Sequence, residues 1–179
     1  SLNDNPRHHF VHGNIGNSDL VSSLLKKYKV RAVINFAAES HVDRSIQNAS
    51  NFVQTNIVAT HQFLETIRLY WGNLDLHIKN TFRFVHVSTD EVYGSLERQA
   101  EPFTEECVYK PNNPYSATKA ASDHLVRAWH QTYNLPATGS WVSDINLNNN
   151  SFKVLNQIST KTKQPHLAKY KEPNLLSNI

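Results

Sequence analysis

The segment TFRFVHVSTDEVYG, residues 81–94, decides the fold that the sequence predicts. Its first part, TFRFVHVST, carries the aromatic and β-branched residues Phe84, Val85 and Val87, which are typical of a strand buried on both faces of a sheet. Its second part is polar and follows at the carboxyl end of that strand. The segment therefore predicts a buried strand that delivers polar side chains to one edge of a sheet.

Strand and helix patterns alternate on both sides of this segment, as far as Pro136. Such alternation is typical of βα units, so we expect an α/β fold with a partial, Rossmann-like, doubly wound parallel sheet over residues 1–136. The further strands are expected at residues 8–15 (HHFVHGNI) and 31–40 (RAVINFAAES), and the helices at residues 18–29, 48–70 and 113–134.

The bulk composition is that of a soluble globular protein. Of 179 residues, 39% are hydrophobic and 18% are charged, and no apolar run approaches the roughly 20 residues that a membrane span needs. The net charge of +3 is modest and its basic residues are dispersed, which argues against a nucleic-acid partner. The start lacks a signal-peptide pattern and Cys107 has no second cysteine to pair with, so a cytoplasmic location is expected.

Two regions carry weaker signals. Residues 137–179 are polar and Asn-rich, and we expect them to form a divergent, weakly ordered tail, in which VLNQIS could be a short helix or strand. Near the start, His8, His9 and His12 are close in sequence, but no cysteine or acidic cluster completes a metal site, so no metal is expected.

A tyrosine and a lysine lie four residues apart in YSATK. On a helix, Tyr115 and Lys119 share one face. An ammonium group close to a phenol favours the phenolate, which can take a proton from a hydroxyl near neutral pH. The alternative is an amphipathic helix that carries these two residues by chance.

An acid pair follows a hydroxyl at the end of the central strand. Thr89, Asp90 and Glu91 are expected at the carboxyl edge of the sheet, where doubly wound folds bind ligands. Two carboxyl groups in different surroundings can serve as acid and base. The alternative is a turn that Asp90 caps, with Glu91 solvated.

Small residues follow the preceding strand, in NFAAES. Ala37 and Ala38 would let the backbone approach a flat or charged cofactor closely. The alternative is that the two alanines simply begin a turn.

Four motifs together resemble the extended short-chain dehydrogenase/reductase family, and within it the bacterial sugar-nucleotide 4,6-dehydratases. They are INFAAESHVDRSI, FVQTN, FRFVHVSTDEVYG and NPYSATKAASDHLV, in the order and spacing of the family, and the likeness covers about His9 to Pro136.

This resemblance implies an NAD-dependent dehydration of a nucleotide-activated glucose, with dTDP-glucose as the expected substrate. Tyr115, assisted by Lys119 and Thr89, would take the proton of the 4-hydroxyl while C4 is oxidised. Glu91 would then remove the C5 proton while Asp90 protonates the departing 6-hydroxyl, and a hydride would return to C6.

The resemblance also implies cofactor contacts and a partner. A homodimer is expected through the long helices, and exposed Phe63, Leu64, Trp129 and Tyr133 would support an interface there. The implied NAD contacts are Asn14 and Ile15 at the adenine end, Phe36, Ala37, Ala38, Glu39 and Ser40 along the cofactor, Thr55, and Tyr115 with Lys119 at the ribose and nicotinamide.

The sequence departs from the family in three places. The glycine-rich fingerprint that holds the pyrophosphate is missing, since the five glycines of the chain form no G-x-G-x-x-G pattern. Asn14 stands where family members commonly have an aspartate, and the resemblance to the substrate-binding lobe is missing after Pro136. We therefore expect weak NAD binding and little turnover from the isolated chain. The alternatives are an epimerase or reductase on the same scaffold, for which Asp90 and Glu91 would be dispensable, and an inactive oligomerisation module.

Overall fold

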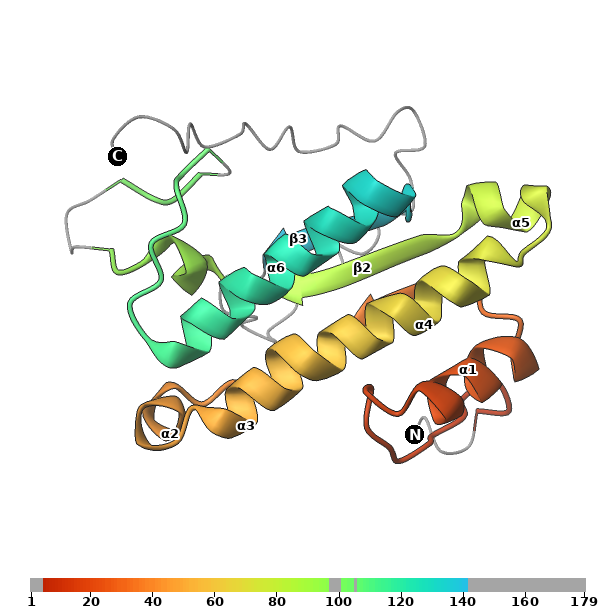
Figure 1. Ribbon diagram of the computed structural model, residues 1–179, viewed down its shortest axis with the longest axis horizontal. Coiled ribbons are helices and arrows are strands. Elements are labelled where there is room, and N and C mark those ends of the chain that lie inside the picture. Colours follow the sequence, from red (N-terminus) through yellow and green to blue (C-terminus); the bar gives the residue numbers. More distant parts are fainter. Residues whose placement is uncertain (1–4, 97–100, 105, 142–179) are drawn as a thin grey trace.

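The structure is a computed structural model that describes residues 5–96, 101–104 and 106–141 (Figure 1). The strands are β1 (Ala32–Asn35), β2 (Arg83–Ser88) and β3 (Ala137–Trp141). The α-helices are α1 (Ser18–Lys27), α2 (Val42–Gln47), α3 (Ser50–Phe52), α4 (Thr60–Gly72), α5 (Leu76–Thr81) and α6 (Pro114–Tyr133). The π-helix η2 (Val53–Ala59) joins α3 to α4, and the 3₁₀-helix η3 (Asp90–Tyr93) follows β2.

The three strands form one parallel sheet in the order β1-β2-β3. Ala32 pairs with Arg83, and Phe84 pairs with Ala137, so β2 lies in the centre. Helices connect consecutive strands, as parallel pairing requires. The parallel sheet with flanking helices that the alternating pattern predicts is confirmed.

One expected strand does not form. Residues 8–15 run without secondary structure apart from a turn at Ile15, and Phe10 and Val11 are 80% and 43% exposed. In the part of the chain that the structure describes, β1 pairs with β2 alone, and the segment 8–15 forms no ladder with the other edge of β1. Its alternating apolar residues gain no burial, and the strand prediction is wrong there.

The sheet also extends beyond the boundary expected at Pro136. Leu135 is fully buried, Phe84 donates its amide to the Pro136 carbonyl at 2.9 Å, and β3 begins at the next residue. The sequence ATGSW has no apolar alternation, and it becomes a strand because the free edge of β2 supplies its backbone partners. The rest of the expected tail, residues 142–179, lies outside the described residues.

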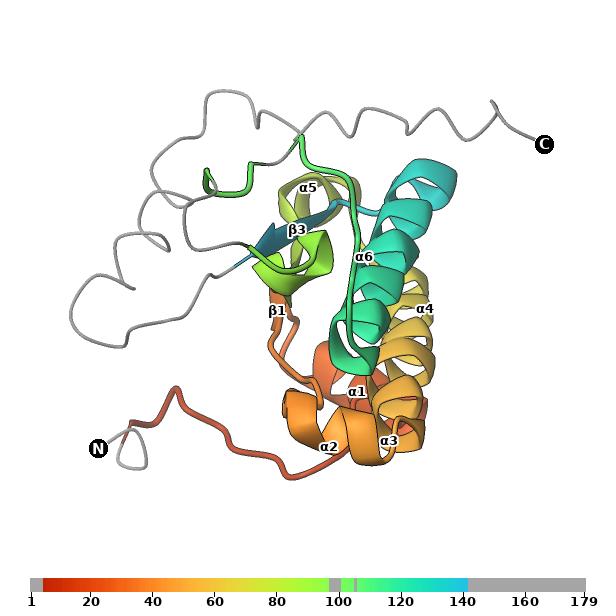
Figure 2. The same ribbon diagram turned by 90° about the vertical axis from the view of Figure 1, so that its left-hand side faces the viewer.

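The three longest helices lie on the same face of the sheet, as Figure 2 shows for α1, α4 and α6. Along β2, the side chains of Phe84, His86 and Ser88 are buried against them, whereas Val85 and Val87 on the other face are half-buried. The main core fills the space between helices and sheet and consists of Val21, Leu25, Phe63, Leu64, Ile67, Phe82, Phe84, Val126, Leu135 and Ala137. Each large side chain in it contributes roughly 1.5–3 kcal/mol through burial.

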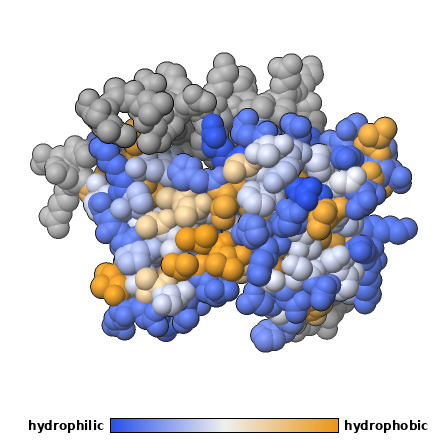
Figure 3. Space-filling model, viewed as in Figure 1, coloured by the Kyte–Doolittle hydropathy of each residue, from blue (hydrophilic) through white to orange (hydrophobic). Residues whose placement is uncertain are grey.

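The surface of the long helices differs from the expectation. Phe63 and Leu64 are 8% and 0% exposed and belong to the core, and Trp129 is partly buried against it, so these three do not offer an open apolar face. Tyr133, at 42%, is exposed as expected. Figure 3 shows apolar residues along the line where α6 meets the helix made of α3, η2 and α4.

Helix α6 begins at a well-defined cap. The Asn113 side chain accepts a hydrogen bond from the Ser116 amide at 2.8 Å, and the Ser116 hydroxyl accepts one from the Asn113 amide at 3.3 Å. Pro114 occupies the first turn, and the helix ends at Asn134 in the left-handed conformation, with φ of 57°. This cap fixes the rotation of α6 and therefore the face on which Tyr115 and Lys119 lie.

A membrane-spanning helix needs a long apolar stretch, and the described residues contain no such helix.

Candidate active site

The carboxyl end of β2 meets the first turns of α6. Thr89 caps η3, because its hydroxyl accepts a hydrogen bond from the Glu91 amide at 3.3 Å. The phenol of Tyr115 lies next to the same hydroxyl, since hydrogen bonding with Thr89 acts to lower the pKa of Tyr115. Two segments that are distant in sequence, STDE and YSATK, are therefore adjacent.

Both members of the acid pair lie beside this contact and are half-buried. Asp90 Oδ1 accepts a hydrogen bond from Thr89 Oγ1 at 3.4 Å, and Glu91 Oε2 accepts one from Asn113 Nδ2 at 3.2 Å. The two carboxyl groups thus have different partners. A solvated Glu91, the alternative that the sequence leaves open, is not what the structure has.

The surroundings of Tyr115 keep its hydroxyl protonated. Burial raises the pKa of Tyr115, the hydrogen bond with Thr89 opposes this rise, and the charges of Glu91 and Asp90 raise the pKa further. Lys119 does not lower it as expected, since its Nζ donates to the Val87 carbonyl at 2.6 Å and burial lowers the pKa of Lys119 itself.

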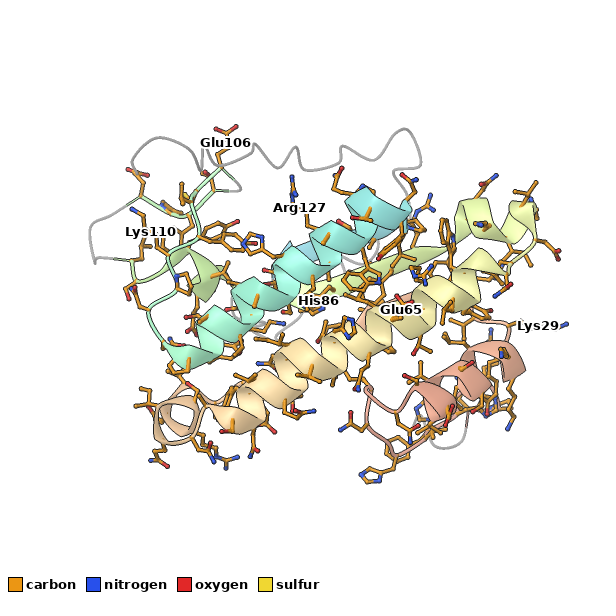
Figure 4. The ribbon with its side chains drawn as sticks, in the orientation of Figure 1. Lys29, Glu65, His86, Glu106, Lys110 and Arg127 are labelled. Carbon is orange, nitrogen blue, oxygen red and sulfur yellow. The ribbon has the colours of Figure 1, made fainter. Side chains whose placement is uncertain are left out.

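A buried polar chain lies beneath the site, centred on His86 at the junction of β2 with α4 and α6 (Figure 4). Asn35 Oδ1 accepts from the Ala37 amide at 3.1 Å, so its Nδ2 must donate to His86 Nδ1, also at 3.1 Å. His86 Nε2 then carries the hydrogen and donates to Ser122 Oγ at 3.1 Å, and Ser122 donates to the Lys119 carbonyl at 2.8 Å. This chain links the loop after β1 to Lys119.

The loop after β1 is held by one side chain that the sequence reading did not identify. Asn56, 1% exposed in the π-helix η2, accepts from the Glu39 amide at 2.9 Å and donates to the Glu39 carbonyl at 3.0 Å. It also donates to Thr118 Oγ1 of α6 at 3.0 Å. The π-helix is common at functional sites, and here it carries the residue that ties three segments together.

The candidate cofactor residues fall into two groups. Phe36, which is 60% exposed, begins the loop that Asn56 holds next to α6. The first group lies on and around this loop and comprises Phe36, Ala37, Ala38, Glu39, Ser40, Thr55, Tyr115 and Lys119. Within it, Thr55 lies in η2 next to Asn56. Asn14 and Ile15 form the second group and line a hollow of about 770 Å³ between α1 and β1, which no member of the first group lines.

Further polar residues around the site escaped the sequence reading, although each lies within a quoted motif. Asp123 is 5% exposed and accepts from Ser88 Oγ at 2.5 Å and from Tyr109 Oη at 3.1 Å. Ser45, fully buried in α2, accepts from the Tyr115 amide at 3.2 Å. Among the described residues, no three His, Cys, Asp or Glu side chains are placed to hold a metal ion.

Comparison with known proteins agrees with this arrangement. A family model described as GDP-mannose 4,6 dehydratase matches residues 1–174. The chain belongs to this dehydratase family. The match extends past Pro136, where the sequence reading placed the end of the resemblance.

Individual dehydratase relatives match a shorter stretch. A dTDP-glucose 4,6-dehydratase of Xanthomonas campestris pv. campestris is 57% identical over 136 residues, which are 76% of this chain and 38% of that protein. A crystal structure of a dTDP-glucose 4,6-dehydratase double mutant from Streptomyces venezuelae with NAD bound has a TM-score of 0.68 at 40% identity, covering 78% of this chain and 39% of that one. A UDP-glucose 4-epimerase from Brucella ovis in complex with NAD has a TM-score of 0.63 at 26% identity, covering 74% and 37%. The chain thus spans about two fifths of the length of these proteins.

Proposed function

We propose that this protein takes part in the NAD-dependent 4,6-dehydration of dTDP-glucose, giving dTDP-4-keto-6-deoxyglucose. The observation that carries the proposal is the convergence of Thr89, Asp90, Glu91 and Tyr115 at the carboxyl end of β2. The similarity to proteins named dTDP-glucose 4,6-dehydratase supports the substrate class.

The described residues fit one half of NAD. A loop with exposed Phe36, small residues at Ala37 and Ala38, and the buried Lys119 nearby suits the ribose and nicotinamide end. The chain has no G-x-G-x-x-G pattern to form a pyrophosphate cradle, and its two nearest glycines are Gly13 and Gly16. When bound, NAD would supply the hydride acceptor for the oxidation at C4 and the donor for the reduction at C6.

The first proton transfer falls to Tyr115. The sugar 4-hydroxyl would lie against the phenol oxygen and Thr89 Oγ1, which lie next to each other. Because burial and the three carboxyl groups of Glu91, Asp90 and Asp123 raise the pKa of Tyr115, the phenol needs a positive charge before it can accept that proton as phenolate. The ammonium of Lys119, one turn further along α6, is bound to the Val87 carbonyl in this structure, so it would have to turn toward the phenol to supply the charge.

The elimination of water falls to the acid pair. A ketone at C4 acidifies the proton at C5, which the carboxylate of Glu91 would remove. Asp90 would give its proton to the departing 6-hydroxyl. The hydrogen bond from Asn113 holds Glu91 against the start of α6, whereas Asp90 faces Thr89, so the two carboxyl groups approach a bound hexose from different positions.

The acid pair can be tested in a chimera that joins this chain to those segments of the Xanthomonas relative that lie outside the aligned 136 residues. With NAD and dTDP-glucose, we expect a product that is lighter by one water. Glu91→Gln should reduce its formation at least about 100-fold, as for loss of a general base, and should abolish solvent deuterium incorporation at C5. The matched control is Glu106→Gln, since Glu106 is exposed on the segment before α6, away from the site (Figure 4).

An epimerase is the second candidate, and the match with the Brucella ovis enzyme favours it as the alternative. An epimerase would return a sugar of unchanged mass with inverted configuration at C4, and Glu91→Gln would leave its turnover intact. Either result would refute the dehydratase proposal.

We also propose that the protein forms a homodimer through its long helices. Val53 in η2 and Leu69 in α4 are 43% and 53% exposed, and Tyr133 at the end of α6 is 42% exposed. These side chains, together with the apolar line in Figure 3, replace Phe63 and Leu64 as the candidate contacts.

A further inference from the structure

A carboxylate and an ammonium group are buried together beneath the candidate site. Asp123 and Lys119 are 5% and 3% exposed, and they lie four residues apart on α6, on the face that packs against β2. Burying either charge without compensation is costly, so each needs a partner inside the protein.

The hydrogen bonds of these two groups leave their charges uncompensated. Lys119 Nζ donates to the neutral carbonyl of Val87 at 2.6 Å. Asp123 Oδ2 accepts from the neutral hydroxyls of Ser88 and Tyr109, at 2.5 and 3.1 Å. Asp123 Oδ1 is buried and has no hydrogen-bond partner among the described residues.

His86 cannot supply the missing positive charge. Its Nε2 lies 3.7 Å from Asp123 Oδ1, but its Nδ1 accepts from Asn35, so it has no lone pair left for a second proton. Burial and the nearby Lys119 lower the pKa of His86 to about 3, so the ring is neutral at physiological pH. The charge of Lys119 opposes the rise that burial causes in the pKa of Asp123, and the charge of Asp123 opposes the fall in the pKa of Lys119.

We propose that Asp123 is a positioning residue whose buried carboxylate keeps Lys119 in its ammonium form, seated on the Val87 carbonyl. The consequence for Tyr115 rests on the proposed function, in which the ammonium of Lys119 acts on the phenol and opposes the rise that the charge of Asp123 itself causes in the pKa of Tyr115. The charge coupling of Asp123 with Lys119 does not rest on it. The titratable groups facing the pair are His86 on β2, Tyr109 on the segment before α6, Tyr115 and His124 on α6, and Asp90 and Glu91 on η3, which face Tyr115.

The test is an NMR titration of the 179-residue chain carrying ¹³C-labelled lysine, in which Lys119→Arg assigns the Lys119 signal. Asp123→Asn keeps the shape of the side chain and removes its charge, and it should lower the pKa of Lys119 by about one unit or more. Asp123→Glu restores the charge and should recover at least about half of that shift. Tyr109→Phe is the matched control, because it removes a hydrogen bond to Asp123 and leaves the charge, and it should leave the titration of Lys119 unchanged.

A residue that only anchors Ser88 and Tyr109 would behave differently. Asp123→Asn would then lower the melting temperature and leave the pKa of Lys119 where it was, which would overturn the proposal. If Asp123→Asn does not fold, the wild-type protein decides, because the Lys119 resonance should show an inflection at the pH where the Asp123 carboxyl titrates. The absence of that inflection would overturn the proposal as well.

None of these readouts needs NAD or a sugar. A chimera without dehydratase activity, combined with a Lys119 titration that depends on Asp123, would refute the proposed function and keep the coupling. Dehydratase activity combined with a Lys119 titration that does not depend on Asp123 would support the proposed function and refute the coupling.

Discussion

Replacing Asn56 by Ala should release the loop after β1. The Asn56 side chain makes three hydrogen bonds, two with the backbone of Glu39 and one with Thr118, and it is 1% exposed. No other hydrogen bond of the described structure ties Glu39 to α6 in this way, so the part of the loop around Glu39 depends on this amide.

The expected loss of stability follows from those contacts. A net contribution of about 1 kcal/mol for each hydrogen bond gives about 3 kcal/mol in total. The half-buried backbone of Glu39 can regain water after the substitution, which lowers the cost, while the buried hydroxyl of Thr118 keeps its bond to the Tyr115 carbonyl at 2.8 Å. The cavity left behind raises the cost, so about 3 kcal/mol remains the central value.

Urea denaturation followed by far-UV circular dichroism measures the free energy of unfolding, and hydrogen exchange measures protection of the Glu39 amide. Asn56→Ala should lower the free energy of unfolding by about 3 kcal/mol and remove the protection of the Glu39 amide. Gln54 is exposed in the same π-helix, so Gln54→Ala should change the free energy of unfolding by no more than about 0.5 kcal/mol and leave the Glu39 amide protected. A loss below about 1 kcal/mol with the Glu39 amide still protected would refute the reasoning that Asn56 holds the loop.

Three further predictions follow from the fold and the site. Since the folded-state pKa of His86 is lowered from 6.5 to about 3, its contribution to stability is present above pH 6.5 and is lost as the pH falls toward 3. Between pH 7 and 4.5 the wild type should lose about 3 kcal/mol more than His86→Gln in urea titrations, and equal losses would contradict this. Calorimetric titration of the isolated chain with NAD should detect no binding in the micromolar range, because the chain lacks a glycine-rich cradle, and micromolar affinity would contradict that expectation. Sedimentation equilibrium should give twice the chain mass of 20.4 kDa, and Leu69→Asp should shift the mass toward the monomer, whereas a wild-type monomer would contradict the dimer.

The central strand and the long helices could be predicted because their signals are local and redundant. Around β2, aromatic and β-branched residues agree with burial, and along residues 50–72 and α6 the apolar spacing agrees with the helical period. The strand expected at residues 8–15 has the same kind of local signal, yet this segment pairs with no described strand and its Phe10 and Val11 stay exposed. For β3 the local sequence predicts no strand, and the segment becomes one because it pairs with the edge of β2.

The contact of Tyr115 with Thr89 was predictable from the sequence, because the carboxyl end of a parallel strand and the start of the next helix meet at one edge of the sheet. The charge relation of Tyr115 with Lys119 was not, because it depends on where the ammonium of Lys119 ends, and that group reaches the Val87 carbonyl rather than the phenol. A spacing of four residues along a helix predicts that two side chains lie on one face, but it does not predict which group each side chain binds.

The supporting shell of the site follows a different pattern, which hydrophobic periodicity cannot detect. On α6, the buried residues of the first half are polar apart from Ala120, and the next buried apolar residue is Val126. On the preceding long helix, Asn56 occupies the position between Phe52 and Ala59 that an apolar side chain would fill. Buried polar groups persist in a native structure when they are paired, so a polar residue in an apolar stripe signals a partner elsewhere in the fold. Here the partners lie on β2, on the loop after β1 and on α6 itself, and all of them surround the candidate active site. The first half of the buried face of α6 is therefore mainly polar because its side chains bond with the segments around the candidate active site, and the main hydrophobic core begins further along the same helix, at Val126.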